Sequence, residues 1–147
     1  MQFEIITKNS KLTAELLNIL QKEWPEAYGW LTDIIDDWSL TDLPRIVVAT
    51  EKEEIIGCYS LVAEELVKDN HGYAPWLGVL FVREKYRGKH FSPELIKNAC
   101  QHVKEMGYNS LYLATEHIGL YEKFGFAEIG LGIYLWGMPT KFYRKDV

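Results

Sequence analysis

Hydrophobic positions along this chain recur with two different periods, which predicts a domain built from both helices and strands. The apolar residues at 12, 16, 19 and 20 fall on one face of a helix that opens at Ser10 and ends before Pro25. A second helix is predicted over residues 26–38. Short apolar runs bounded by turn residues predict strands over 3–7, 45–50, 55–64, 75–82 and 111–115, and a last extended stretch over 126–136.

The longest helical pattern covers residues 93–106 and ends at Gly107. Its apolar stripe would pack against a sheet and consists of Leu95, Ile96, Ala99, Cys100, Val103 and Met106. A short helix is predicted over 120–124. This order of elements is typical of an α/β domain with a mixed sheet and helices on both faces. We find no repeat or linker, so one domain over residues 1–147 is expected.

Composition narrows the classes of protein and of ligand. The chain has 147 residues, 48% of them apolar, and its 16 Lys+Arg against 21 Asp+Glu give a net charge of −5. That balance disfavours a surface for nucleic acid or for a membrane, so a site for an anion must be local. Two unpaired cysteines and the lack of a signal peptide or a long apolar span indicate a cytoplasmic protein. Four scattered histidines predict no metal site.

One such local site is a basic loop. Four of the sixteen basic residues lie within seven positions, at Arg83, Lys85, Arg87 and Lys89. Directly downstream, Ser92 is a good N-cap and Pro93 a good first helical residue. A helix N-terminus favours negative charge, so this segment would suit a diphosphate. The alternative is a charged surface turn that is only solvated.

Two motifs resemble the GNAT superfamily of acyl-CoA-dependent N-acyltransferases. They read Tyr-Arg-Gly-Lys-His-Phe-Ser at 86–92 and Leu-Tyr-Glu-Lys-Phe-Gly-Phe at 120–126, and the specific part of the likeness covers residues 75–126. The resemblance implies a central, mostly antiparallel sheet with helices on both faces. It also implies acetyl-CoA as acyl donor and direct attack by an amine in a ternary complex.

The resemblance implies a set of residues that bind the coenzyme. Arg87 opens the family's diphosphate-binding pattern, in which His90 replaces the first glycine and Ser92 the small final residue. An oxyanion-stabilising N–H is expected within residues 79–81. The implied contacts to acetyl-CoA are Leu80, Phe81, Val82, Arg87, Gly88, Lys89, His90, Phe91, Ser92 and Tyr121.

Two residues are expected to act in catalysis. Tyr121 matches the family tyrosine that protonates the leaving thiolate, which suits a phenol of pKa ~10 beside a thiol of ~8.5. The alternative for Tyr121 is core packing. The family's strand carboxylate is missing here, so His117 is the predicted base. Other choices are a water relay or one of Glu116, His71, Glu64 and Glu65.

The predicted acceptor pocket is aromatic and acidic. Trp30 and Asp33 on the second helix, with Trp76 on the strand, would bind a cationic amine by charge pairing and cation–π contact. Alternatively, the tryptophans are core residues and the aspartates a solvated face. The resulting hypothesis is an N-acetyltransferase for a small-molecule or peptide amine, with a homodimer as the family habit. The competing hypothesis is a non-catalytic module that binds coenzyme A or a partner protein.

Overall fold

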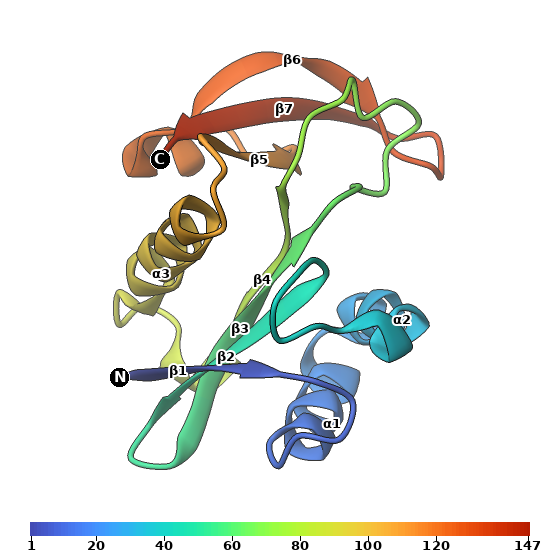
Figure 1. The fold of residues 1–147 in the computed structure, drawn as a ribbon. Helices are drawn as coiled ribbons and strands as arrows, with labels where there is room; N and C mark the ends of the chain where they lie inside the picture. The colour runs from blue at the N-terminus through green and yellow to red at the C-terminus, as the bar shows by residue number, and fades with distance from the viewer. The chain divides into compact units, whose positions relative to one another are not determined.

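A computed structural model describes all 147 residues and forms two compact units, each assembled from two segments of the chain (Figure 1). The first unit comprises Met1–Leu61 and Val79–Leu95, and the second Val62–Gly78 and Ile96–Val147. Strand β4 (Trp76–Val82) and helix α3 (Phe91–Glu105) contribute residues to both units. The sheet order is β1-β2-β3-β4-β5-β7-β6. A mixed, mostly antiparallel sheet flanked by helices is therefore confirmed.

The first unit is built on an antiparallel meander of β1 (Gln2–Ile6), β2 (Arg45–Glu51) and β3 (Glu54–Val62). The β2–β3 turn is tight, and Lys52 and Glu53 adopt positive φ angles of 51° and 67°. Such angles match the right-handed twist of a hairpin. The predicted hairpin is thus confirmed, with strand bounds that differ by one or two residues.

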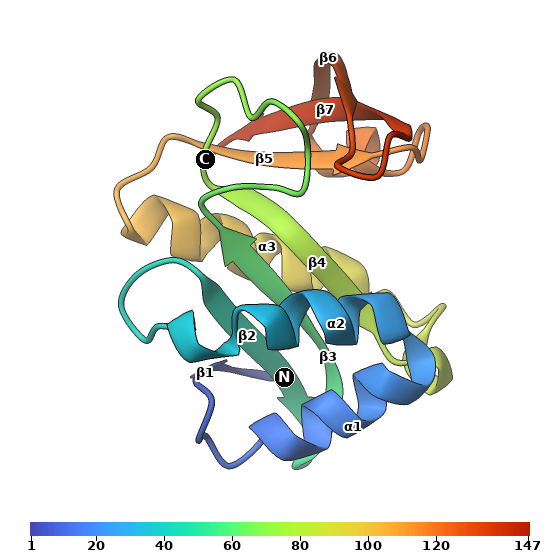
Figure 2. The same ribbon diagram turned by 90° about the vertical axis from the view of Figure 1, so that its right-hand side faces the viewer.

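Helices α1 (Thr13–Glu23) and α2 (Pro25–Asp33) cover one face of these strands (Figure 2). Leu16 and Leu20 of α1 and Leu31 of α2 are almost fully buried against the sheet. The second helix ends five residues earlier than predicted. Ile34 leaves the helical region at φ −115°, and the 3₁₀ helix η1 (Ile35–Asp37) follows. Trp30, Ile34 and Trp38 have helical spacing in the sequence but therefore do not share one helical face.

A β-bulge in β3 fixes the end of β4. Ala49 pairs with Gly57 but Thr50 pairs with Ile55, so Ile56 is the extra residue. The Ile56 carbonyl accepts the N–H of Arg83 at 2.9 Å. Next to it, a Cβ on Gly57 would lie only 2.0 Å from the carbonyl oxygen of Phe81. Glycine at 57 is thus required for the close approach of β3 and β4.

The second unit contains the first residues of β4 with β5 (Ser110–Thr115), β7 (Pro139–Asp146) and β6 (Ala127–Ile133). β4 and β5 run parallel with Trp76 opposite Tyr112, and the β5–β7 and β6–β7 pairs are antiparallel. The prediction of one extended stretch over 126–136 was incomplete, because it missed β7. That strand carries Lys141 between its buried residues, and Arg144 and Lys145 directly after them, which hides its apolar pattern.

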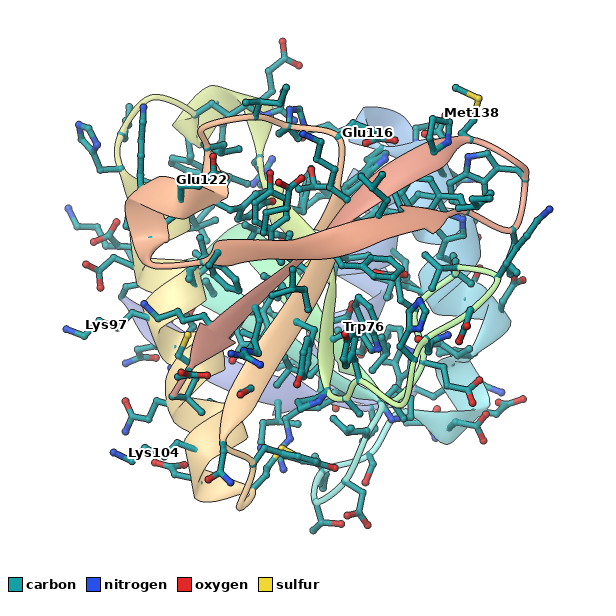
Figure 3. All side chains as sticks on the ribbon, turned by 90° about the horizontal axis from the view of Figure 1, so that it is seen from above. Trp76, Lys97, Lys104, Glu116, Glu122 and Met138 are labelled. Atoms are coloured by element: carbon teal, nitrogen blue, oxygen red, sulfur yellow. The ribbon has the colours of Figure 1, made fainter.

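The core of the second unit is aromatic. Trp76 lies edge-on to Phe142 with ring centroids 5.3 Å apart, and Tyr73 stacks on Tyr112 at 4.7 Å. Figure 3 labels Trp76 within the unit and Met138 at the turn between β6 and β7. A Cβ on Gly132 would lie 2.2 Å from the Phe142 ring, so β6 needs glycine to pack there.

Helix α3 starts two residues earlier than predicted, at Phe91, and ends as expected. Of its predicted stripe, Leu95, Ile96, Ala99 and Val103 are buried, whereas Cys100 is only half-buried. Lys97 and Lys104 project outward (Figure 3). Gly107 has φ 93° and its N–H donates to Lys104, while the Tyr108 N–H donates to Val103. This pair of bonds is a Schellman cap, for which glycine is the favoured residue.

Candidate functional site

The end of β4 and the loop after it form the first part of the candidate site. The 3₁₀ helix η2 (Glu84–Tyr86) turns the chain away from the strand. The guanidinium of Arg87 folds back, and its Nε donates to the Val82 carbonyl at 3.1 Å. Gly88 then adopts φ 79° and His90 φ 63°, and α3 begins at the next residue. The loop is therefore anchored to the strand that precedes it and to the helix that follows.

Carboxylates already pair with two of the four basic side chains in this loop. Arg83 lies 3.8 Å from Glu23 and 3.5 Å from Glu54, atom to atom, and Lys85 hydrogen-bonds Glu54. The Lys85 ammonium in turn holds the pKa of the Glu54 carboxyl below its ordinary value. Two of the four cations that the sequence offers to a phosphate therefore already have carboxylate partners. Arg87 and Lys89 are exposed and form no ion pair.

His90 adopts a left-handed backbone conformation at a position where the family pattern has glycine. Its φ of 63° lies in the left-handed region, which costs an L-residue about 1–2 kcal/mol relative to glycine. The histidine that replaces glycine here therefore adopts a backbone conformation that glycine favours. Ser92 and Pro93 lie in the first turn of α3, so the predicted N-cap at Ser92 was placed two residues too late. Pro93 is tolerated there because first-turn N–H groups lack helical acceptors.

One N–H of the predicted oxyanion segment of β4 has a side-chain acceptor. The N–H of Val79 donates to the hydroxyl of Ser60 on β3 at 2.8 Å. The Val79 N–H therefore already has an acceptor. The N–H groups of Leu80 and Phe81 are the other candidates for stabilising the oxyanion. The Phe81 ring lies against Trp24 with centroids 6.4 Å apart. Sequence reasoning missed Ser60, because nothing in a buried apolar strand marks one serine as a backbone partner.

The predicted acceptor residues of the first unit differ in exposure. Trp30 is half-buried and packs edge-on against Trp24, with ring centroids 5.9 Å apart. Asp33, the last residue of α2, is exposed. Because the helix ends there, Asp36 does not share its face, and Asp36 pairs instead with Lys8 at 2.9 Å. The acidic surface at the end of α2 is therefore smaller than the sequence suggests.

The burial of Trp76 removes it from the residues predicted to bind the acceptor. Its side chain is fully buried in the second unit, and its indole N–H donates to the Tyr73 carbonyl at 2.7 Å. A residue enclosed in this way cannot contact an acceptor directly. Its role is to hold the start of β4 in the aromatic core, so the alternative interpretation as a core tryptophan applies.

The second unit carries the two predicted catalytic residues. Tyr121 begins the 3₁₀ helix η3 (Tyr121–Phe124), and its ring lies edge-on to Phe126 at 6.0 Å. Gly125 ends this helix at φ 90°, where a Cβ would lie 2.7 Å from Lys145 Nζ. Lys145 Nζ also donates to the Phe124 carbonyl at 2.5 Å. The motif around Tyr121 is thus a turn held by one glycine and one lysine from β7.

Tyr121 and His117 have different environments. Burial, and to a smaller extent the neighbouring Tyr134, raises the pKa of the Tyr121 phenol above its ordinary value. The phenol is therefore protonated at neutral pH, as a proton donor must be. His117 is exposed, and its backbone N–H donates to the Thr115 hydroxyl at 3.1 Å. Its surroundings do not mark it as a base.

Among the alternative bases, Glu65 has the most perturbed environment. It is half-buried, and burial raises the pKa of its carboxyl to about 7. Its Oε1 accepts the Leu66 N–H at 2.7 Å. The Glu65 N–H donates to Asn70 Oδ1 at 2.8 Å, and Asn70 Nδ2 donates to the Glu65 carbonyl at 3.3 Å. These two hydrogen bonds hold the loop in shape. A carboxyl with this pKa can exchange protons near neutral pH.

No group of three or more His, Cys, Asp or Glu side chains is arranged to hold a metal ion. None of the helices has the length and apolar character that crossing a membrane requires.

Comparison with solved structures supports the fold. An aminoglycoside 6′-acetyltransferase of type Ii superposes with a TM-score of 0.75 at 21% identity, over 99% of this chain and 97% of that one. The aminoglycoside 6′-N-acetyltransferase from Enterococcus faecium gives 0.74 at 18% over the same shares. A GNAT acetyltransferase from Elizabethkingia anophelis with acetyl-CoA bound gives 0.68 at 17%, again over 99% and 97%. No curated protein matches the sequence significantly.

The family itself is shown by sequence. The model of the acetyltransferase (GNAT) family matches residues 12–126, which include the β4 strand, the basic loop, α3 and the Tyr121 turn. The expected resemblance and enzyme class are therefore confirmed. The chain belongs to the acetyltransferase (GNAT) family.

Proposed function

We propose that the protein transfers an acetyl group from acetyl-CoA to the amine of a small molecule. The observation that carries this proposal is the loop over residues 87–92, where Gly88 and His90 both adopt left-handed φ angles directly before α3. A solved structure with acetyl-CoA bound supports this donor. A second one, named as an aminoglycoside acetyltransferase, supports a small-molecule amine as acceptor.

The diphosphate of the donor would bind to this loop. The first N–H groups of α3 have no acceptors within the helix. They can therefore donate to an anion at the N-terminus of the helix. Arg87 and Lys89 supply the positive charge, since Arg83 and Lys85 are paired with carboxylates. Leu80, Phe81 and Val82 would line the pantetheine arm, and a strand N–H of Leu80 or Phe81 would stabilise the oxyanion.

The reaction needs one base and one acid. The neutral amine attacks the thioester carbonyl, so a C–N bond forms, and the tetrahedral intermediate collapses with cleavage of the C–S bond. The amine gives one proton to a base, and the departing thiolate takes a proton from Tyr121. The Tyr121 phenol carries its proton at neutral pH, so it can donate to the thiolate, and the tyrosinate left behind takes a proton back from water.

Two measurements test the proposal. Acetyl-CoA should bind in isothermal titration calorimetry, and free thiol should appear when a 6′-amino aminoglycoside, spermidine or a peptide with a free N-terminus is added. A lack of acetyl-CoA binding would overturn the proposal. Binding without thiol release across these amines would instead favour a non-catalytic coenzyme-binding module.

Tyr121→Phe separates catalysis from binding. The variant keeps the ring that packs on Phe126 and loses only the hydroxyl. Turnover should fall about 10²-fold or more while acetyl-CoA affinity stays within about twofold. Unchanged turnover would exclude Tyr121 as the acid.

A further inference from the structure

A cavity in the second unit lies beside the loop between β3 and β4. It has a volume of about 490 Å³ and is lined by Leu135 and by residues 64–72. The loop is tied to the β6–β7 turn by backbone hydrogen bonds, from Lys68 N–H to Ile133 O at 2.8 Å and from Leu135 N–H to Leu66 O at 3.0 Å. The cavity wall is therefore fixed by secondary structure on both sides, and its volume is large enough for a small ligand.

Most of the charge in this wall is negative. Glu64, Glu65 and Asp69 line the cavity, against the single lysine Lys68. His71 also lines it, and its Nδ1 lies 3.5 Å from Asp69 Oδ2. Glu64 and Asp69 are exposed, whereas Glu65 is half-buried. A cationic ligand thus matches the wall, and Glu65 is its most shielded charge.

Tyr134 connects this cavity with the predicted catalytic acid. Tyr134 lies opposite Val67 in an isolated β-bridge, and its hydroxyl donates to the Ala114 carbonyl at the end of β5, at 3.3 Å. Burial raises the pKa of Tyr134 most, and the charges of Glu116 and Glu65 raise it further. Tyr134 in turn raises the pKa of Tyr121. Glu65 and Tyr121 therefore both interact electrostatically with Tyr134.

We propose that this cavity, hereafter the Glu65 cavity, receives the protonated amine of the acceptor and that the Glu65 carboxylate accepts the proton lost by the amine. The inference rests on the proposed function and names its acceptor subsite and its base. Glu64 and Asp69 attract the ammonium, and Glu65 takes one of its protons and returns it to water, which leaves the neutral amine as the nucleophile. The amine then attacks the thioester carbonyl, and Glu65 takes the second N–H proton as the C–N bond forms. The protonated Glu65 returns that proton to water as well, so no co-reactant is needed.

The pH dependence follows from the groups around Glu65. These are Glu64, Lys68, Asp69 and His71 in its own loop and Tyr134 from the β6–β7 turn. Because burial raises the pKa of Glu65 to about 7, the active carboxylate is lost as the pH falls below 7. The turnover rate of the wild-type protein should therefore rise with pH through about 7 and then level off.

Glu65→Gln is the central variant. Its amide oxygen can still accept the Leu66 N–H, so the loop should fold as before. Thiol release is followed from pH 5.5 to 9 with 4,4′-dithiodipyridine, using acetyl-CoA with spermidine or a 6′-amino aminoglycoside. We expect turnover to fall about 10²–10⁴-fold and the rise near pH 7 to disappear. Acetyl-CoA affinity should stay within twofold, and Glu65→Asp should restore part of the activity and of the pH-dependent rise.

Glu51→Gln is the matched control, because Glu51 is an exposed glutamate at the end of β2 in the first unit. It should behave as the wild type. If the wild type releases thiol and Glu65→Gln does so at the same rate with the same pH profile, the Glu65 assignment is overturned and the proposed function stands. If the wild type releases no thiol with any amine, both are overturned.

Discussion

His90 replaces a glycine of the family pattern and adopts a backbone conformation that glycine favours. Its φ of 63° is one that histidine tolerates and that β-branched residues strongly disfavour. The sequence shows only that a histidine replaces the family glycine at this position, because only the residue type is visible there. The backbone angle was not predictable, since it is imposed by Gly88 on one side and α3 on the other.

This angle makes a direct prediction for stability. His90→Gly should leave the free energy of unfolding unchanged or raise it by up to about 1 kcal/mol, whereas His90→Val should lower it by more than about 1 kcal/mol. Urea unfolding measures both. Acetyl-CoA affinity should be retained in the glycine variant and reduced in the valine variant. Equal stability of the two variants would contradict a loop held in the left-handed region.

Glu65 predicts how stability depends on pH. Its folded pKa of about 7 lies above the ordinary 4.5, so between these values the folded state binds more protons than the unfolded chain. Stability from this group is therefore full below pH 4.5 and lost as the pH rises through 7, by about 3 kcal/mol at the most.

Glu65→Gln should remove that loss. Chemical unfolding at pH 5 and pH 8 should show the variant gaining stability relative to the wild type at pH 8 only. An equal difference between the two proteins at both pH values would mean that the Glu65 carboxyl titrates normally.

At the level of elements, the strands and helices with one clean apolar face were predictable and the irregular parts were not. α1, β4 and the end of α3 at Gly107 follow directly from periodicity and capping. The early end of α2 was missed because Trp30, Ile34 and Trp38 have helical spacing. In the structure Trp38 turns inward, and its indole N–H donates to the Leu31 carbonyl at 3.1 Å. A tertiary hydrogen bond of this kind leaves no trace in local sequence.

The contact between β3 and β4 depends on the absence of a side chain at Gly57. Gly57→Ala should destabilise the protein by several kcal/mol, because its Cβ would meet the Phe81 carbonyl and that atom belongs to the backbone. Gly29→Ala is the matched control, since its Cβ would meet nothing within 4 Å inside helix α2. It should stabilise by about 0.5–1 kcal/mol. Thermal unfolding of the two variants distinguishes these effects, and equal melting temperatures would contradict the close approach.

The basic loop predicts a difference between two lysines. Lys89 forms no ion pair, whereas Lys85 hydrogen-bonds Glu54. Lys89→Gln should therefore weaken acetyl-CoA binding several-fold and reduce its salt dependence, and Lys85→Gln should change both much less. Calorimetric titrations at 50 and 300 mM salt measure this. A larger effect at Lys85 would show that the diphosphate displaces Glu54 from its partner.

For the whole molecule, a net charge of −5 excluded a general polyanion surface and left room for one anion site. The family resemblance identified the fold and the loop, because both motifs lie in contiguous sequence. The Glu65 cavity was not predictable as a site. Its wall joins residues 64–72 to Leu135, which are separated by more than sixty positions, and only the path of β6 and β7 brings them together.

Strand β7 has a consequence for how the protein is made. It is synthesised after β5 and β6 yet lies between them in the sheet. While the ribosome is still adding residues 127–138, β5 and β6 have no hydrogen-bonded partner in common, and the second unit cannot close. The first unit draws only on residues up to Leu95 and can fold earlier. A nascent chain stalled before Pro139 should therefore expose β-strand edges, which are the preferred targets of chaperones and the sites where aggregation starts.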